Sequence, residues 1–213
     1  DRGRAGFAVG EKATESTFKR LAPKSSILHV ATHGFFFSQE CGSAKAEGAT
    51  ERGLSLVQVD TEGDDLLSSV ENPLLLSGLL FAGAQSGPKG GDDGVLTAEE
   101  VMALDLSGVD LVTLSACDTG RGDVLEGEGV IGLRSAFIHA QARGLVMTLW
   151  KVPDVPTVSL MGNFYRELFE SDEMAPGQAL REAMLAASQS SDARYRHPRA
   201  WAAFTYTGKT QGR

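Results

Sequence analysis

The chain has 213 residues, of which 42% are hydrophobic and 23% charged, and its formal net charge is −8. This composition is ordinary for a globular protein, and no apolar run is long enough for a membrane span. The acidic balance argues against a nucleic-acid partner, because phosphate binding relies on clustered lysine and arginine. The length fits one domain over residues 1–213 better than two.

The two cysteines, Cys41 and Cys117, are too few for a disulfide framework. We therefore expect a reducing, cytoplasmic location, and the N-terminus lacks the basic and apolar segments of a secretory signal. No CxxC, HExxH, Walker or dinucleotide pattern is present, so neither a metal nor a cofactor is expected. His29 is interpreted as a hydrogen-bonded strand histidine.

Caps, turns and apolar periodicity predict the elements before residue 100. The segment 14–22 (TESTFKRLA) favours a short helix with Thr14 as its cap. The run 27–32 (ILHVAT) is typical of a buried strand, and it delivers His33 and Gly34 at its carboxyl end. The remaining segments predict loops at 38–53 and 86–94, an edge strand at 54–59, and either strand or helix at 73–84.

From residue 97 onward, helices and strands alternate. Thr97 and Glu100 form a capping box that opens a short helix. Buried strands are predicted at 110–115 and 144–150, with an amphipathic helix from 130 to 140 between them. Further helices are predicted at 157–170 and 177–189, and a closing strand at 201–207. This alternation implies right-handed crossovers and a mostly parallel sheet, as in α/β folds.

Cys117 leaves the strand 110–115 and enters a polar turn that contains glycine. Ligands of parallel sheets bind outside the carboxyl ends of the strands, so Cys117 and His33 can share one site. A thiol nucleophile needs an imidazole base and N–H donors for the oxyanion. His33 is the candidate base, and the N–H groups of Gly34 and Cys117 are the candidate donors. A lone cysteine at a strand end is more often a small buried hydrophobe, so the prediction depends on the pair.

Five motifs occur in unbroken order: His33-Gly34, SACDTG at 115–120, GEGVIGLRSAF at 127–137, LWKVPD at 149–154 and WAAF at 201–204. Together they resemble the CHAT family, caspase-like cysteine peptidase domains of the clan that includes caspases, gingipains and separase. The resemblance covers about residues 13–208. It implies a caspase-like, three-layer α/β/α sandwich with a mostly parallel central sheet, and a catalytic dyad of His33 and Cys117.

The same resemblance implies partners and a setting. CHAT domains are often attached to tetratricopeptide repeats, so we expect such a repeat region upstream and regulation by it or by a partner. The implied substrate is a protein or peptide. A role in prokaryotic defence or programmed cell death is expected by analogy.

The chain departs from caspases at two points. His33 and Cys117 are 84 positions apart, against roughly 50 in caspases, and the loops at 38–53 and 84–94 explain the difference. Ser115 replaces the glutamine that precedes the caspase cysteine, which argues against caspase-like specificity for aspartate.

Asp154 is the main candidate for substrate specificity. Its segment resembles the part of separase that supplies an acidic residue for a P1 arginine, and a carboxylate can pair with a guanidinium through two hydrogen bonds. Alternatively, Asp154 caps the next helix. Ser115 and Asp118 are further candidates for substrate contact.

The favoured hypothesis is a cysteine endopeptidase that cleaves one or few proteins after arginine or lysine. The alternative is a catalytically silent module that keeps the fold and binds partners. A small-molecule acyl transferase is a third interpretation, and it would need a pocket that sequence does not reveal.

Overall fold

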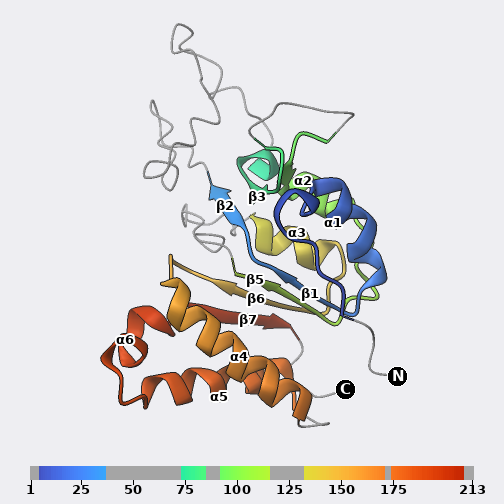
Figure 1. Ribbon diagram of the computed structural model, residues 1–213. Coiled ribbons are helices and arrows are strands. Elements are labelled where there is room, and N and C mark those ends of the chain that lie inside the picture. The colour runs from blue at the N-terminus through green and yellow to red at the C-terminus, as the bar shows by residue number, and fades with distance from the viewer. Residues whose placement is uncertain (1–4, 37–72, 85–91, 116–131, 171–173, 209–213) are drawn as a thin grey trace, which may run out of the picture.

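The computed structural model describes residues 5–36, 73–84, 92–115, 132–170 and 174–208. Within these residues the strands form two sheets (Figure 1). The first sheet consists, in spatial order, of β1 (Ile27–Val30), β5 (Leu111–Leu114), β6 (Gly144–Thr148) and β7 (Phe204–Gly208). Strands β1, β5 and β6 are parallel, and β7 pairs antiparallel with β6. The prediction of a mostly parallel central sheet is confirmed.

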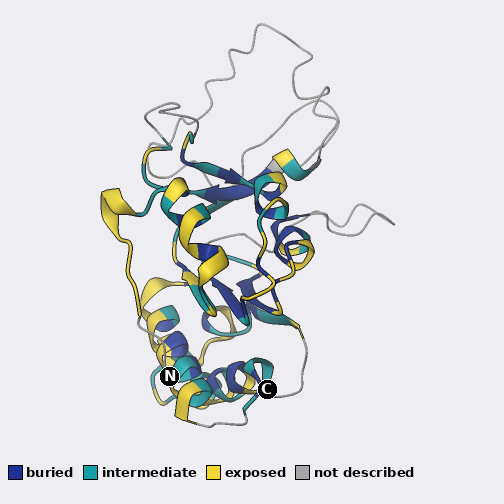
Figure 2. Cartoon of the chain, turned by 90° about the vertical axis from the view of Figure 1, so that its right-hand side faces the viewer, coloured by how far each residue is buried: buried dark blue, intermediate teal, exposed yellow. Residues whose placement is uncertain are grey.

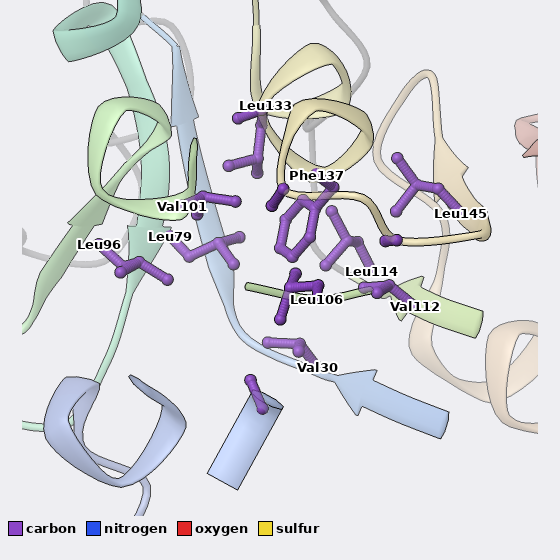
Figure 3. Packing of buried hydrophobic residues seen from close by; sticks show 14 of the residues in the cluster. Val30, Leu79, Leu96, Val101, Leu106, Val112, Leu114, Leu133, Phe137 and Leu145 are labelled. Carbon is purple, nitrogen blue, oxygen red and sulfur yellow. The ribbon is translucent and has the colours of Figure 1, made fainter. Parts of the chain in front are cut away.

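The central strands are buried on both faces. Leu114 and Met147 belong to one apolar cluster, whereas Leu111 and Val146 belong to another. Successive strand residues point to opposite faces, so a strand buried on both sides is mostly apolar, as β5 and β6 are, with Thr113 and Thr148 as their buried polar residues. Figure 3 shows members of the first cluster gathered around Phe137.

Helices cover both faces of this sheet. On one side lie α1 (Glu15–Leu21), α2 (Ala98–Met102) and α3 (Leu133–His139), and on the other lie α4 (Asp154–Glu170) and α5 (Pro176–Ser188) (Figure 1). Figure 2 shows buried residues on the strands and inner helix faces, with exposed residues on the outer turns. The architecture is therefore the expected α/β/α sandwich.

A second, antiparallel sheet was not predicted. It consists of β2 (His33–Phe36), β3 (Ser77–Leu80) and β4 (Val95–Thr97). The expected strand 27–32 ends early at Val30, and His33 begins a strand of this other sheet. Gly78 allows the close pairing of β3, because a Cβ there would lie 2.4 Å from the carbonyl oxygen of Leu96.

Several predicted boundaries hold, and others move by a few residues. Thr14 caps α1, and Thr97 and Glu100 form the expected capping box of α2. Helix α4 begins at Asp154, earlier than predicted, and Pro156 fits its first turn because a helix start needs no N–H donor there.

The remaining short elements are η1 (Gly10–Lys12), η2 (Ala22–Lys24), η3 (Pro73–Leu76), α6 (Ala193–Arg196) and η4 (Pro198–Ala200). The ambiguous segment 73–84 thus contains η3 and β3. The predicted loops 38–53 and 116–128, the predicted strand 54–59 and most of the loop 86–94 lie outside the described residues. No helix in the described segments combines the length and hydropathy needed to cross a bilayer.

Candidate active site

The candidate site lies where β1 and β5 end side by side. Val30 pairs with Leu114 in the parallel register, and these are the last residues of the two strands. The Ser115 N–H then donates a hydrogen bond of 2.9 Å to the Val30 carbonyl, which continues the pairing one step beyond the strands. Ser115 is half-buried. The segments that follow β1 and β5 therefore begin side by side at this edge of the sheet.

His33 starts β2, and its side chain is exposed. It pairs with Leu80 of β3, so its backbone belongs to the second sheet and not to the first. The Thr32 hydroxyl donates a hydrogen bond to the carbonyl of the same Leu80. The backbone that carries His33 is thus held by strand pairing and by the side chain before it.

Thr32 was not among the residues predicted for the site. The sequence does show a hydroxyl residue directly before His33, the candidate base. The carbonyl that accepts its hydrogen bond, however, belongs to Leu80, 48 positions away in the sequence. Gly34, the candidate oxyanion donor, is half-buried and pairs with Leu79.

Asp154 is the exposed first residue of α4, which follows β6. A carboxylate at this position also interacts favourably with the positive end of the helix dipole, so the capping interpretation keeps its physical basis. Among the described residues, no hydrogen bond or ion pair joins Asp154 to His33 or Ser115. Cys117 and Asp118 lie outside the described residues.

Trp150 is a second residue near the site for which no role was predicted. It follows β6, and its Nε1–H donates a hydrogen bond of 3.2 Å to the carbonyl of Arg199. This bond links the segment leading to Asp154 with η4. The half-buried indole therefore fixes part of the chain beside the carboxyl end of the sheet.

His29 has a structural partner, as expected. Its Nδ1 lies 2.9 Å from the Tyr165 hydroxyl, which in turn donates to Thr113 Oγ1 at 3.0 Å. The surrounding protein lowers the pKa of His29 and raises the pKa of Tyr165, because it disfavours both charged forms.

Within the described part of the chain, no group of three or more acidic, histidine or cysteine side chains could hold a metal ion.

Comparison with known proteins identifies the family. The CHAT domain model matches residues 1–209. Tetratricopeptide repeat protein 28 from Mus musculus is 36% identical over 114 residues, which are 54% of this chain and 4% of that protein. Tetratricopeptide repeat protein 28 from Homo sapiens matches with the same identity and coverage. The chain therefore spans only a small part of these relatives. Since the family model covers nearly all 213 residues, the chain belongs to the CHAT domain family, within the caspase-like cysteine peptidase clan.

Proposed function

We propose that this domain is a cysteine endopeptidase in which Cys117 is the nucleophile and His33 the base. The observation that carries the proposal is the strand register. Each β1 residue pairs with the β5 residue 84 positions later, as Ile27 does with Leu111. His33 and Cys117 are also 84 positions apart, and each follows its paired strand end by three residues. A shared site at the carboxyl ends of adjacent parallel strands agrees with the general rule for such sheets.

The reaction follows from these two groups. Cys117 Sγ transfers its proton to the His33 imidazole and forms a bond to the scissile carbonyl carbon. The carbonyl oxygen becomes an oxyanion and accepts hydrogen bonds from the N–H groups of Gly34 and Cys117. The carbon–nitrogen bond then breaks, and His33 returns the proton to the leaving amine. Water next cleaves the thioester with His33 as base, which releases a carboxylate and restores the thiol.

Substrate preference is proposed to depend on an acidic pocket. Asp154 would pair with an arginine or lysine at P1, and Ser115 and Asp118 would line the same subsite. An exposed carboxylate at the start of α4 could take a guanidinium in two parallel hydrogen bonds. The half-buried position of Ser115 at the end of β5 also supports a place near the scissile bond.

Regulation by helical repeats belongs to the same proposal. Both curated relatives are named tetratricopeptide repeat proteins, and the matched region is 4% of their length. We infer that this domain likewise works within a repeat-containing protein, which controls its access to one or few protein substrates.

Active-site labelling tests the catalytic assignment. A peptide acyloxymethyl ketone ending in arginine should alkylate the wild-type chain once, at Cys117, with loss of its carboxylate leaving group. The variants Cys117→Ala and His33→Ala should each lose both labelling and peptide cleavage, whereas Cys41→Ala should keep both. Circular dichroism would verify that all variants fold.

Turnover by a folded Cys117→Ala variant would reject the thiol mechanism. If the wild-type chain neither reacts nor cleaves, alone or joined to a repeat region, the alternative of a silent caspase-fold interaction module is correct. The intact His33 and Cys117 favour the enzyme over that module.

A further inference from the structure

A groove lies between α4 and the segment that runs from the end of α5 through α6 to η4. Its volume is about 200 Å³. The floor of the groove is apolar and consists of Pro156, Leu160, Ala187 and Ala200. Figure 1 shows α4, α5 and α6 close together on one side of the first sheet. The floor residues are small apart from Leu160, which leaves the space above them open.

The size of the groove favours one side chain of a peptide over a small molecule. Pockets that enclose small molecules usually have about 300–1,000 Å³, and this groove is smaller. Surfaces that bind extended peptides use separate pockets for individual side chains, and one buried apolar anchor can supply much of the binding energy. The apolar floor therefore fits a single large apolar side chain.

Arginine side chains stand at the rim of the groove on both banks. Arg166 of α4 donates from Nη2 to Oδ1 of Asn163 at 2.9 Å, and Asn163 lines the groove. Arg196 of α6 donates from Nη1 to the carbonyl of Ser190 at 3.1 Å, and Ser190 lines the opposite bank. A guanidinium has five N–H groups, so each arginine keeps donors for a ligand.

The acidic side chains around the groove are paired with arginine. Asp192 is the one carboxylate among the described lining residues, and Arg194 Nη2 donates to its Oδ2 at 2.7 Å. Glu167 lies 3.8 Å from Arg166, and Glu182 lies 2.9 Å from the adjacent arginine of α5. Neither glutamate lines the groove. The rim therefore keeps a positive balance beside the apolar floor.

This positive region stands out in an acidic chain. The formal net charge is −8, yet residues 193–213 contain arginine and lysine and neither aspartate nor glutamate. Arg199, directly before the floor residue Ala200, is exposed, and within the described residues its side chain has no ion pair. Carboxylates are the natural ligands of such arginines. A nucleic acid fits less well, because the rest of the chain repels phosphates and the apolar floor would have no use.

We propose that this groove binds a linear acidic segment of a partner protein. One large apolar side chain of that segment fills the groove over Leu160 and Ala200. Aspartate or glutamate on either side of it pairs with Arg166, Arg194 and Arg196 at the rim. The groove contains neither member of the proposed dyad, so the inference does not rest on the peptidase activity.

Fluorescence anisotropy with the 213-residue chain tests the proposal. The probe is a short fluorescent peptide with one central phenylalanine and glutamates on both sides. One matched probe has alanine in place of the phenylalanine, and another has glutamine in place of the glutamates. The first probe should bind saturably, and each matched probe should bind about tenfold more weakly. Added salt should weaken binding of the glutamate probe more than that of the glutamine probe.

Filling the groove should block the apolar side chain. Ser159 lines the groove from an exposed position on α4, so Ser159→Phe adds an aromatic ring there without disturbing the core. This variant should weaken binding of the phenylalanine probe about tenfold. Val158→Phe is the matched control, because Val158 is 73% exposed on the same helix and does not line the groove. It should leave binding unchanged.

Removing one arginine from the rim should have a smaller effect, because single exposed charge pairs contribute little. Arg166→Gln and Arg194→Gln should each weaken binding of the glutamate probe about threefold. Arg143→Gln is the matched control, since Arg143 is also an exposed arginine paired with an aspartate, Asp110, but does not line or border the groove. Thermal unfolding should show that all variants stay folded.

The proposal is overturned if the wild-type chain shows no saturable binding, or if Val158→Phe weakens binding as much as Ser159→Phe. Equal effects of Arg143→Gln and Arg194→Gln would also overturn it. So would displacement of the probe by an oligouridylate of the same net charge as readily as by the unlabelled peptide, since the surface would then be a general anion site without use for the groove.

Discussion

Lys19 is the residue on which three carboxylates converge. Its Nζ lies 2.5 Å from Glu15 Oε1, 2.9 Å from Glu100 Oε1 and 3.2 Å from Asp92 Oδ1. Glu15 is only 1% exposed and also accepts the Gly94 N–H at 2.9 Å. Burial raises the pKa of Glu15, and the hydrogen bonds from Lys19 and Gly94 oppose that effect. The cluster therefore ties α1 and α2 to the segment before β4.

Replacing Lys19 should destabilise the fold. Lys19→Met keeps the aliphatic stem and leaves the buried Glu15 carboxylate without its cation, which is unfavourable in a poorly solvated site. We expect a loss of about 2–3 kcal/mol in the free energy of unfolding, below the range for a fully buried pair because Lys19 is partly exposed. Urea denaturation measures the loss. Lys24→Met, at an exposed lysine of η2, should change stability little, and an equal effect of both variants would contradict this account.

At the scale of elements, β2 and β3 connect the cluster around Lys19 to His33, the candidate base. Gly94 holds the end of β3, because its carbonyl accepts the Phe81 N–H at 2.7 Å. Its φ of +82° and the 2.4 Å that would separate a Cβ from Ala84 N require glycine there. Leu80, directly before Phe81, pairs with His33 and accepts the Thr32 hydroxyl. The position of His33 thus depends on how firmly β2 and β3 are joined.

Thr32 is proposed as a positioning residue for His33. Thr32→Val removes the hydrogen bond to Leu80 at nearly constant volume, so β2 should hold the imidazole less firmly. We expect kcat to fall roughly tenfold, the equivalent of about 1.4 kcal/mol, with KM little changed. Steady-state kinetics of a peptide substrate measures both constants, and Thr32→Ser should restore most of kcat. Equal activity of the valine and serine variants would show that the hydroxyl has no such role.

The two sheets differ in how far the sequence predicts them. Strands β5 and β6 are short apolar runs followed by polar turns, and both were predicted to within a few residues. Strand β3 contains Gly78 and has no clear period, and its partner β2 is far away in the sequence. Pairing between such distant segments leaves no local signal, so the second sheet was missed. Helix α6, with four residues, was missed because it is too short for a periodic pattern.

At the scale of the whole molecule, the proposed site would combine segments from both sheets and one helix. The strand-end rule predicted one shared site for His33 and Cys117, and the register shows that β1 and β5, the strands before them, end together. The Thr32 bond was beyond prediction, because it depends on the position of β3. The catalytic roles of His33, Gly34 and Cys117 and the substrate roles of Asp154, Ser115 and Asp118 stay predictions.

Asp154 links the helix layer to the proposed chemistry, and its substitution tests specificity. Asp154→Asn keeps the shape and a capping oxygen but removes the charge. If the carboxylate binds P1 arginine through charge-assisted hydrogen bonds, each contributes about 1.5–3 kcal/mol. The variant should then lose roughly tenfold or more in kcat/KM for a P1 arginine peptide, and little for the matched P1 glutamine peptide. Glu170→Gln, at the opposite end of α4, should keep the wild-type preference. If Asp154→Asn lowers the melting temperature but leaves the arginine preference unchanged, Asp154 acts as a helix cap, and the basic pocket must involve Asp118 instead.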